Sequence, residues 1–521
     1  MNGELSGGTN GMVYERSDEA GTPRMNLKNK EPMVFASADI ALSFAMLVCG
    51  FLYWNLIRID SLGLGVTLFT VLLCAASMIY FKQAGLRQTK ESLAFLVIIA
   101  LSAANFALFD GLLIKFFNFI FLSLCYVYWI CLTAGARLEN RISPYIVSDM
   151  LRQLILVPFS NFSGCFSGVK QVFVRNQKGK GLLGAILGIL FFLPVLILVV
   201  TLLASADAAF ESLMDKLQLS ISENVVLYIR DIILGLPVAC YLFGLIYGNR
   251  YQRGAGNNTK VSVDRRVEAL RFAPGVTVFS AMTALNLIYL IFFLSQTAYL
   301  FSAFGDSLPQ SMTYAEYARR GFFELCALSG INLAVIGGAQ LIAKRDKIKV
   351  LRGETAVLCV FTIALIVTAM SKMVMYIDSY GLTKLRVYTS WFMVILLFLF
   401  VIILIRQFRS FQGTRLAVVG CICLFLVLCC GNADGLIAKY NIERYQAGTL
   451  KELDVSSLSD LSGGAVPYLY ELYQDTDDPE LKKELRNAIK LSAYRGMRYE
   501  DGLRGFNLQH YKAEQIRNNI Q

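Results

Sequence analysis

Seven polar residues lie at or just inside the ends of long apolar segments, and their types are the ones in this sequence that could do chemistry. Ionisable residues inside a membrane are costly, and they usually serve a function. Because Glu324 follows Arg320 by four positions, the two side chains would share one helix face and could pair. The candidate polar cluster comprises Arg320, Glu324, Lys372, Asp378, Tyr380, Arg386 and Asp434.

A structural role for the same charges is an open alternative, since ion pairs and long side chains reaching the membrane surface are common at helix ends. In either case an unpaired carboxylate at Glu324 would be expensive to bury. We therefore expect a basic partner for Glu324. Arg386 ranks first, because a guanidinium can bind a carboxylate through two hydrogen bonds, ahead of Lys372 and Arg320.

The composition requires a membrane to surround these charges. Of 521 residues, 56% are hydrophobic and only 17% are charged, whereas soluble proteins average about 25% charged residues. About 20 apolar residues span a bilayer, so the sequence predicts an all-α, polytopic transmembrane helix bundle. Eleven segments are long enough to span: 36–57, 61–81, 92–109, 112–134, 182–206, 226–248, 274–296, 321–343, 354–376, 387–406 and 415–431. Asp110 and Gly111 alone separate the third from the fourth, so this pair is either a tight hairpin or includes a re-entrant segment.

Lys and Arg are distributed unevenly between alternate loops. Twenty-four of them lie in the loops on one side of the predicted bundle. Only six lie on the other side: Arg58, Lys216, Arg319, Arg320, Lys384 and Arg386. Because cytoplasmic loops carry the excess of positive charge, the N-terminus is expected in the cytoplasm and the C-terminus outside. The net charge of +11 then reflects topology and anionic lipid, not a nucleic-acid partner.

Three parts of the chain are polar enough to lie outside the bilayer. Residues 1–33 are rich in Gly, Ser, Asn and charge, and we expect them to be a disordered cytoplasmic N-terminus. Within the transmembrane domain, 34–431, the cytoplasmic loop 137–181 contains an amphipathic stretch. This stretch either lies on the membrane surface or is an ordinary packed connector helix. Residues 432–521 predict a small helical exocytoplasmic unit, with Asp478 capping one helix.

The remaining residue types argue against several classes of site. Eleven of the twelve cysteines lie in apolar segments and none lies in the exported tail, so no disulfide is expected. The single histidine, His510, excludes an HExxH zinc site, makes a Ser-His-Asp hydrolase improbable, and is expected to be solvated. The sequence therefore assigns no catalytic, cofactor-binding or metal-binding residue, and an enzyme is the less favoured class.

Three stretches resemble the signature blocks of a known family. They are "YARRGFFELCALSGINL", "KMVMYIDSYGLTKLRVYTSWFM" and "NADGLIAKYNIERYQAG", the last followed by "LSDLSGGAVPYLYEL". They are similar to a bacterial membrane family catalogued only as a domain of unknown function, the DUF four-one-seven-three and four-one-five-three group, over roughly residues 140 to 475. The resemblance implies a multi-pass protein of the bacterial cytoplasmic membrane. It implies no activity, cofactor or catalytic residue.

These observations leave three functions open. A transporter or permease-like protein with an outward-facing polar cavity is favoured by the many spans and the charges at their ends. A non-enzymatic envelope accessory or sensory protein, binding a protein partner through outer loops and the C-terminal tail, is nearly as well supported. A membrane-embedded enzyme acting on a lipid-linked substrate follows well behind, since no reaction-defining motif accompanies Glu324, Asp378 and Asp434.

Overall fold

A computed structural model describes residues 33–174, 223–254, 259–304, 321–494 and 502–520, with a few single positions between 199 and 210. The chain divides into two compact units, Met1–Phe35 and Ala36–Gln521, and the second contains every helix discussed below. In the described residues all regular structure is helical, and one isolated bridge joins Ala273 to Ala343. Ten of the described helices are long and apolar enough to cross a membrane. The prediction of an all-α polytopic bundle is confirmed.

Ten of the eleven predicted spans correspond to these ten helices. The exception is the fifth, 182–206, most of which lies outside the described residues, as does nearly all of the segment 1–33. The uncertain boundary at Asp110 and Gly111 is a hairpin, because one helix ends at Leu108, the next begins at Leu112, and the two pack against each other.

The first group of membrane helices packs closely. It contains α1 (Ser37–Leu56), α2 (Leu64–Gln83), α3 (Lys90–Leu108), α4 (Leu112–Thr133) and α10 (Glu223–Arg250). α1 and α10 cross at Gly50 and Gly235, where a Cβ atom on Gly50 would lie 2.3 Å from the Gly235 carbonyl oxygen. Small residues allow such close approach between membrane helices, so larger side chains at these two positions would force α1 and α10 apart.

Asp39 joins three helices of this group. Its buried carboxylate accepts hydrogen bonds from the Tyr80 hydroxyl (2.7 Å), the Tyr251 hydroxyl (2.8 Å) and the backbone N–H of Ala36 (2.7 Å). It also forms an ion pair with Arg250, whose Nη1 lies 3.0 Å away. A buried carboxylate needs such partners to offset the loss of water, so this cluster holds the ends of α1, α2 and α10 together.

A connector follows α4 and packs against α10. It consists of α5 (Ile146–Leu151), η1 (Arg152–Leu156), α6 (Val157–Ser160) and α7 (Gly164–Val174), and η1 is a π-helical turn. The side chain of Gln153 accepts a hydrogen bond from the Asn249 amide at 2.6 Å. Its other side exposes Val147, Leu151, Ile155, Leu156 and Phe159. The connector therefore has a packed face and an apolar exposed face, and its position on a membrane surface stays a prediction.

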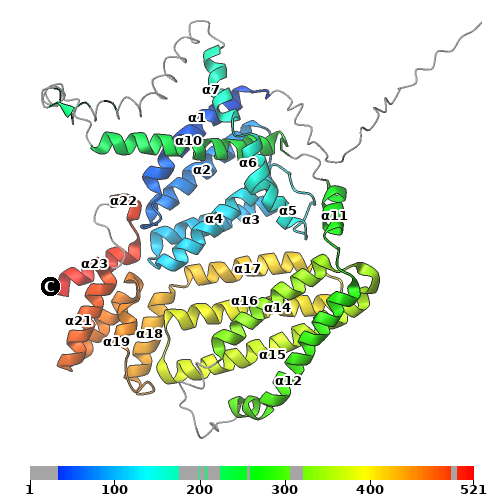
Figure 1. Ribbon diagram of the computed structural model, residues 1–521. Helices are drawn as coiled ribbons and strands as arrows, with labels where there is room; N and C mark the ends of the chain where they lie inside the picture. The colour runs from blue at the N-terminus through cyan, green and yellow to red at the C-terminus, as the bar shows by residue number, and fades with distance from the viewer. Residues whose placement is uncertain are drawn as a thin grey trace, which may run out of the picture. The chain divides into compact units, whose positions relative to one another are not determined.

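The second group of membrane helices has its own hydrophobic core. After α11 (Lys260–Ala269) come α12 (Gly275–Phe304), α14 (Phe322–Ile342), the short η2 (Arg345–Lys347), α15 (Ile348–Tyr380), α16 (Lys384–Phe408) and α17 (Gly413–Cys430). α15 is the centre of the group, packing on α12, α14 and α16 (Figure 1). The two groups of membrane helices contact each other through α17, which touches α3 and α4.

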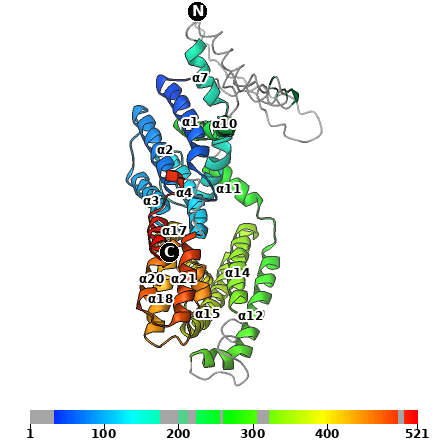
Figure 2. The same ribbon diagram turned by 90° about the vertical axis from the view of Figure 1, so that its left-hand side faces the viewer.

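The C-terminal helices form a compact unit with a separate core. They are α18 (Ala433–Gln446), α19 (Val455–Ser459), η3 (Gly463–Ala465), α20 (Val466–Asp475), α21 (Pro479–Tyr494), α22 (Gly502–Gly505) and α23 (Leu508–Ile520). Asp478 caps α21 as predicted, accepting the N–H of Glu480 at 3.0 Å. The last helix, α23, docks back onto α20 and α21 (Figure 2).

The C-terminal unit binds turns from both groups of membrane helices. The N–H of Leu64, the first residue of α2, donates to the Phe506 carbonyl at 2.8 Å. The turn between α3 and α4 contacts α23 through Asp110, and the turn between α15 and α16 contacts α18 through Leu382. The unit therefore links the two groups at one end of the bundle.

Candidate functional site

A large polar cavity lies between the α15–α16 turn and the C-terminal unit. Its volume is about 1040 Å³. The end of α15 and the start of α16 contribute Asp378, Tyr380 and Arg386 to its wall. The C-terminal unit contributes the segment 449–459 and part of α21, including Lys451, Glu452, Asp454, Glu484 and Asn487.

Gly381 shapes the turn that forms one wall of this cavity. Its φ of +73° is a conformation that side-chain-bearing residues rarely adopt. A Cβ atom there would also lie 2.5 Å from Oδ1 of Asn441. The space is occupied because Asn441 binds the next residue twice, accepting from the Leu382 N–H at 2.7 Å and donating to the Leu382 carbonyl at 2.8 Å. The turn is thereby fixed to α18.

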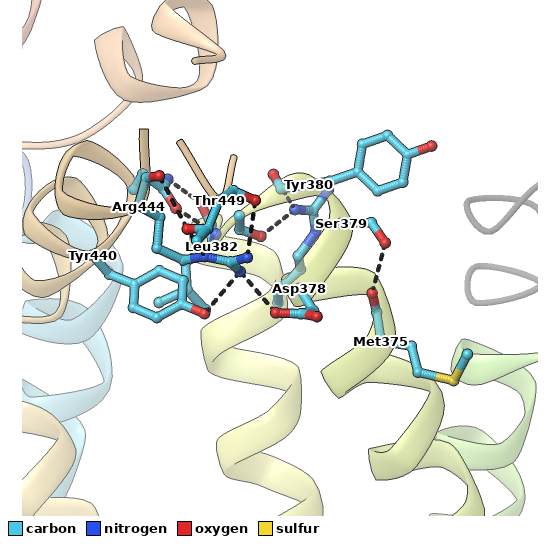
Figure 3. A network of polar contacts seen from close by, with 11 residues as sticks. Met375, Asp378, Ser379, Tyr380, Leu382, Tyr440, Arg444 and Thr449 are labelled. Atoms are coloured by element: carbon cyan, nitrogen blue, oxygen red, sulfur yellow. Dashed lines mark hydrogen bonds and ion pairs between the residues drawn. The ribbon is translucent and has the colours of Figure 1, made fainter. Parts of the chain in front are cut away.

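Arg444 makes the charged contact between α18 and α15 (Figure 3). Its Nη1 lies 3.0 Å from Oδ1 of Asp378 and 3.3 Å from the Tyr440 hydroxyl. The other guanidinium nitrogens donate to the hydroxyl and the carbonyl of Thr449, each at 3.2 Å. Because Asp378 is 74% exposed, this pair is hydrated and positions the cavity wall more than it stabilises the fold.

Arg386 is held by its own turn. Its Nη1 donates to the carbonyls of Tyr380, at 3.0 Å, and of Gly381. Its guanidinium carbon lies 4.1 Å from the centre of the Tyr376 ring, within the range of a cation–π contact. These contacts direct the charge of Arg386 to the α15–α16 turn and not to α14.

The structure brings together three of the seven residues of the candidate polar cluster. Asp378, Tyr380 and Arg386 line the cavity. Asp434 lies nearby on α18, where it is buried, accepts the Ser462 N–H at 2.9 Å and pairs with Lys384 at 3.3 Å. Lys372 is half-buried on α15 and does not line the cavity. The remaining two, on or before α14, are Glu324 and Arg320, and Arg320 lies outside the described residues.

The predicted ion pair between Glu324 and Arg386 is wrong. Glu324 is exposed on the first turn of α14, and within the described ranges its carboxylate forms no ion pair with a basic side chain. The expectation assumed that residues at similar depth on two helices face each other. Glu324 is instead exposed, and the guanidinium of Arg386 donates hydrogen bonds to the carbonyls of the α15–α16 turn.

A second contact region, absent from the predicted cluster, surrounds Asp110 in the α3–α4 turn. Its buried carboxylate accepts the Asn507 amide and the Gly463 N–H, both at 3.1 Å, and lies 3.8 Å from Nδ1 of His510. The prediction that His510 is solvated is wrong, since its side chain is 7% exposed. Burial opposes ionisation of Asp110, yet the His510 contact, the charge of Lys115 and the Gly463 N–H together lower the pKa of this carboxyl group.

No local signal in the sequence pairs Asp110 with His510, because the two residues come from opposite parts of the chain. An acidic residue in a two-residue turn between apolar segments was the one hint, together with the only histidine of the chain. Arg444 was equally hard to recognise, since charged residues are common on solvated helices.

The arrangement can bind a charged ligand, and its chemistry favours recognition. The wall of the large cavity carries carboxylates and basic groups, most of them exposed. Over the ranges that the structure describes, no group of three His, Cys, Asp or Glu side chains is placed to hold a metal ion. All twelve cysteines are described, and each is a free thiol.

Comparison with known proteins places the chain in a family. A family model described as a domain of unknown function, DUF4153, matches residues 93–472. The chain belongs to this family. The match begins within α3, includes every later membrane helix that the structure describes, and ends within α20 of the C-terminal unit. No curated protein and no solved structure matches the chain.

Proposed function

We propose that this integral membrane protein binds a small polar ligand in the large cavity between the α15–α16 turn and the C-terminal unit. One observation carries the proposal: two regions of the chain, a membrane-helix turn and the C-terminal unit, contribute polar walls to one cavity of about 1040 Å³. A protein of this kind is a sensory or accessory component whose ligand-binding site spans both regions.

The charges of the wall indicate the class of ligand. Asp378 is compensated by Arg444, and the carboxylate of Asp454 caps α19. Together, Glu452, Asp454 and Glu484 carry three further negative charges, against two positive charges at Lys451 and Arg386, so the wall keeps a net negative charge. The exposed ring of Tyr380 offers a surface for cation–π contact. The ligand is therefore an organic cation or a peptide with a basic side chain.

Ligand binding to the purified full-length chain tests this proposal. Basic dipeptides and a polyamine should raise the unfolding temperature, and acidic dipeptides at the same ionic strength should not. Replacing Glu452 and Glu484 by Gln should weaken binding about two- to fivefold per residue, as expected for exposed charges. Asp475→Asn, an exposed acid outside the cavity, is the matched control. Equal responses to basic and acidic peptides would refute the proposal.

Transport is the second candidate, and the arrangement of the membrane helices favours it. Two helix groups, each with its own packing, meet through α17 and through the C-terminal unit, and sliding or rocking of two such groups is how many transporters alternate access. Uptake of a bound ligand into proteoliposomes would support transport, whereas binding without uptake would leave recognition as the function.

We also infer that the N-terminus is cytoplasmic and the C-terminal unit exocytoplasmic, in a bacterial cytoplasmic membrane. The charge bias of the loops carries this inference. Contacts within each set of loops support it: Lys260 pairs with Glu139 at 3.0 Å on the side assigned to the cytoplasm, and the turns at Asp110 and Leu382 meet the C-terminal unit on the other. A reporter that is active only after export should be active when fused after Gln521; a cytoplasmic result would contradict the assignment.

A further inference from the structure

A second cavity, much smaller than the first, lies where α17 ends and α18 begins. Its volume is about 20 Å³, enough for one particle of the size of a water molecule. α3 contributes Asn105, α16 contributes Tyr388, and the α17–α18 junction contributes Cys429 and Asp434. No residue lines both cavities.

Two buried oxygen atoms in this wall are hydrogen-bond acceptors without a donor. Oδ1 of Asp434 and Oδ1 of Asn105 have no hydrogen-bond partner among the described groups, although both side chains are almost fully buried, at 4% and 1% exposed. The amide nitrogen of Asn105 donates to the Cys429 carbonyl, which leaves its oxygen free to accept. A buried hydrogen-bond acceptor without a donor costs free energy. A positively charged or polarised ligand in the cavity would interact with both oxygens and offset this cost.

The backbone at the junction brings the C-terminal end of α17 beside the N-terminal end of α18, and the α17 end supplies the negative part of its potential. α17 ends at Cys430, and Asn432 has a left-handed conformation, with a φ of 45°. The last carbonyls of a helix lack intrahelical donors and carry the negative end of the helix dipole. The C-terminal ends of interrupted membrane helices coordinate cations in transporters in this way. Leu428 and Cys429, from the last turn of α17, both line the cavity.

The charges around the cavity limit which cation it can hold. Oδ2 of Asp434 lies 3.3 Å from the Lys384 ammonium group, so part of the carboxylate charge is already compensated. Asp110, which stands beside the cavity at the α3–α4 turn, lies close to the positive charge of Lys115 and accepts hydrogen bonds from Asn507 and Gly463. Divalent ions such as Ca²⁺ take six to eight oxygen ligands and usually several carboxylates. A single, partly compensated carboxylate suits a monovalent ion.

We propose that this cavity binds one monovalent cation of the size of sodium, with Oδ1 of Asp434 and Oδ1 of Asn105 as ligands. Asn105 belongs to the first group of membrane helices, and Asp434 follows directly on the second. The ion therefore joins the two groups at the level of the α17–α18 junction. The proposal does not depend on the ligand of the large cavity, and either site can fail while the other stands.

Thermal unfolding of the purified full-length chain tests the site. The unfolding temperature is measured in sodium chloride and in caesium chloride at the same ionic strength, since caesium is an inorganic cation that is much larger than sodium. Sodium should raise the unfolding temperature saturably, by about 2–4 °C. Asn105→Ala and Asp434→Asn should each abolish this difference. Glu324→Gln, which changes an exposed carboxylate outside both cavities, should keep it.

Two results would overturn the proposal. Identical unfolding curves of the wild-type chain in the two salts would mean that the cavity holds water, and this comparison needs no variant to fold. A sodium response that survives in both Asn105→Ala and Asp434→Asn would place the ion elsewhere. If Asp434→Asn does not fold, Asn105→Ala and direct binding of radioactive sodium to the wild-type chain decide the question.

Discussion

The C-terminal unit is attached to the two groups of membrane helices by charged contacts of opposite character. At the α3–α4 turn, the side chains of Asp110 and His510 are 5% and 7% exposed. At the α15–α16 turn, Asp378 and Arg444 are 74% and 18% exposed and border an open cavity. Removing one partner from a buried polar contact leaves the other without water, whereas an exposed pair is replaced by solvent at little cost. The charged contact of the first attachment is therefore expected to stabilise the docking of the unit more than that of the second.

The largest expected effect is the loss of the anchor at Asp110. Asp110→Ala removes the acceptor for Asn507 and Gly463 and leaves Lys115 and His510 buried without their carboxylate. We expect a destabilisation of about 3–5 kcal/mol, measured by thermal unfolding and by faster proteolysis of the C-terminal unit. Asp110→Asn keeps the shape and one acceptor oxygen, and it should cost less. An unchanged unfolding temperature for Asp110→Ala would show that the contact is no anchor.

The turn at the second attachment should be sensitive to one backbone position. Gly381→Ala places a Cβ atom 2.5 Å from Oδ1 of Asn441 and requires a φ near +73°. We expect a loss of about 1–3 kcal/mol, with weaker ligand binding because the cavity wall moves. Gly448→Ala is the control, because Gly448 also has a positive φ but has open space around it. Its loss of stability measures the cost of the backbone conformation without a steric clash.

Acidification should weaken the contact of the C-terminal unit at Asp110 and leave its contact at the α15–α16 turn unchanged. The pKa of Asp110 is lower in the folded chain than its usual value of about 3.9. Its contribution to stability is therefore complete above the unfolded pKa and disappears as the pH falls through the folded pKa. The difference in stability between wild type and Asp110→Asn should be constant above about pH 5 and shrink below about pH 4. A difference that grew on acidification would contradict this sign.

The exposed ion pair between Asp378 and Arg444 should contribute little to the free energy of unfolding. Arg444→Ala and Asp378→Ala, combined in a double-mutant cycle, should give a coupling of about 0.2–1 kcal/mol. A coupling as large as that expected for a buried contact would remove the contrast between the two attachments.

The smallest effect is expected at Glu324. Its carboxylate is exposed and, among the residues that the structure describes, has no ion-pair partner. Glu324→Gln should change stability by less than about 0.5 kcal/mol in thermal unfolding. A large loss would indicate a partner in the segment before α14.

The contrast between these regions also explains what the sequence could predict. The length of an apolar segment can be read directly from the sequence, so ten helices and the hairpin at Asp110 could be located from local patterns alone. Asp378, Tyr380 and Arg386 could be grouped because they flank one turn, and residues close in sequence at a turn stay close in space. The partners could not be predicted. Which face of α14 meets α15 depends on packing, and this is why the Glu324–Arg386 pair failed.

Contacts between distant segments could not be predicted from the sequence for the same reason. His510 looks like any solvated residue until α23 docks beside the α3–α4 turn. The acceptors of the small cavity are an asparagine in an apolar segment and an aspartate just beyond another, and neither type in isolation indicates a cation. These residues form a site because they are buried, and which residues become buried depends on how the whole chain folds.

The cluster around Asp39 has a consequence for how the chain enters the membrane. Asp39 stands at the start of the first helix, and Tyr80 reaches the ribosome exit 41 residues later, but Arg250 follows only after 211 residues. At synthesis rates of about 5–20 residues per second, that interval lasts on the order of 10–40 s. During this time the Asp39 carboxylate lacks the cation that pairs with it in the folded chain. The final packing of α1 therefore waits for the synthesis of α10, although α2 is already present.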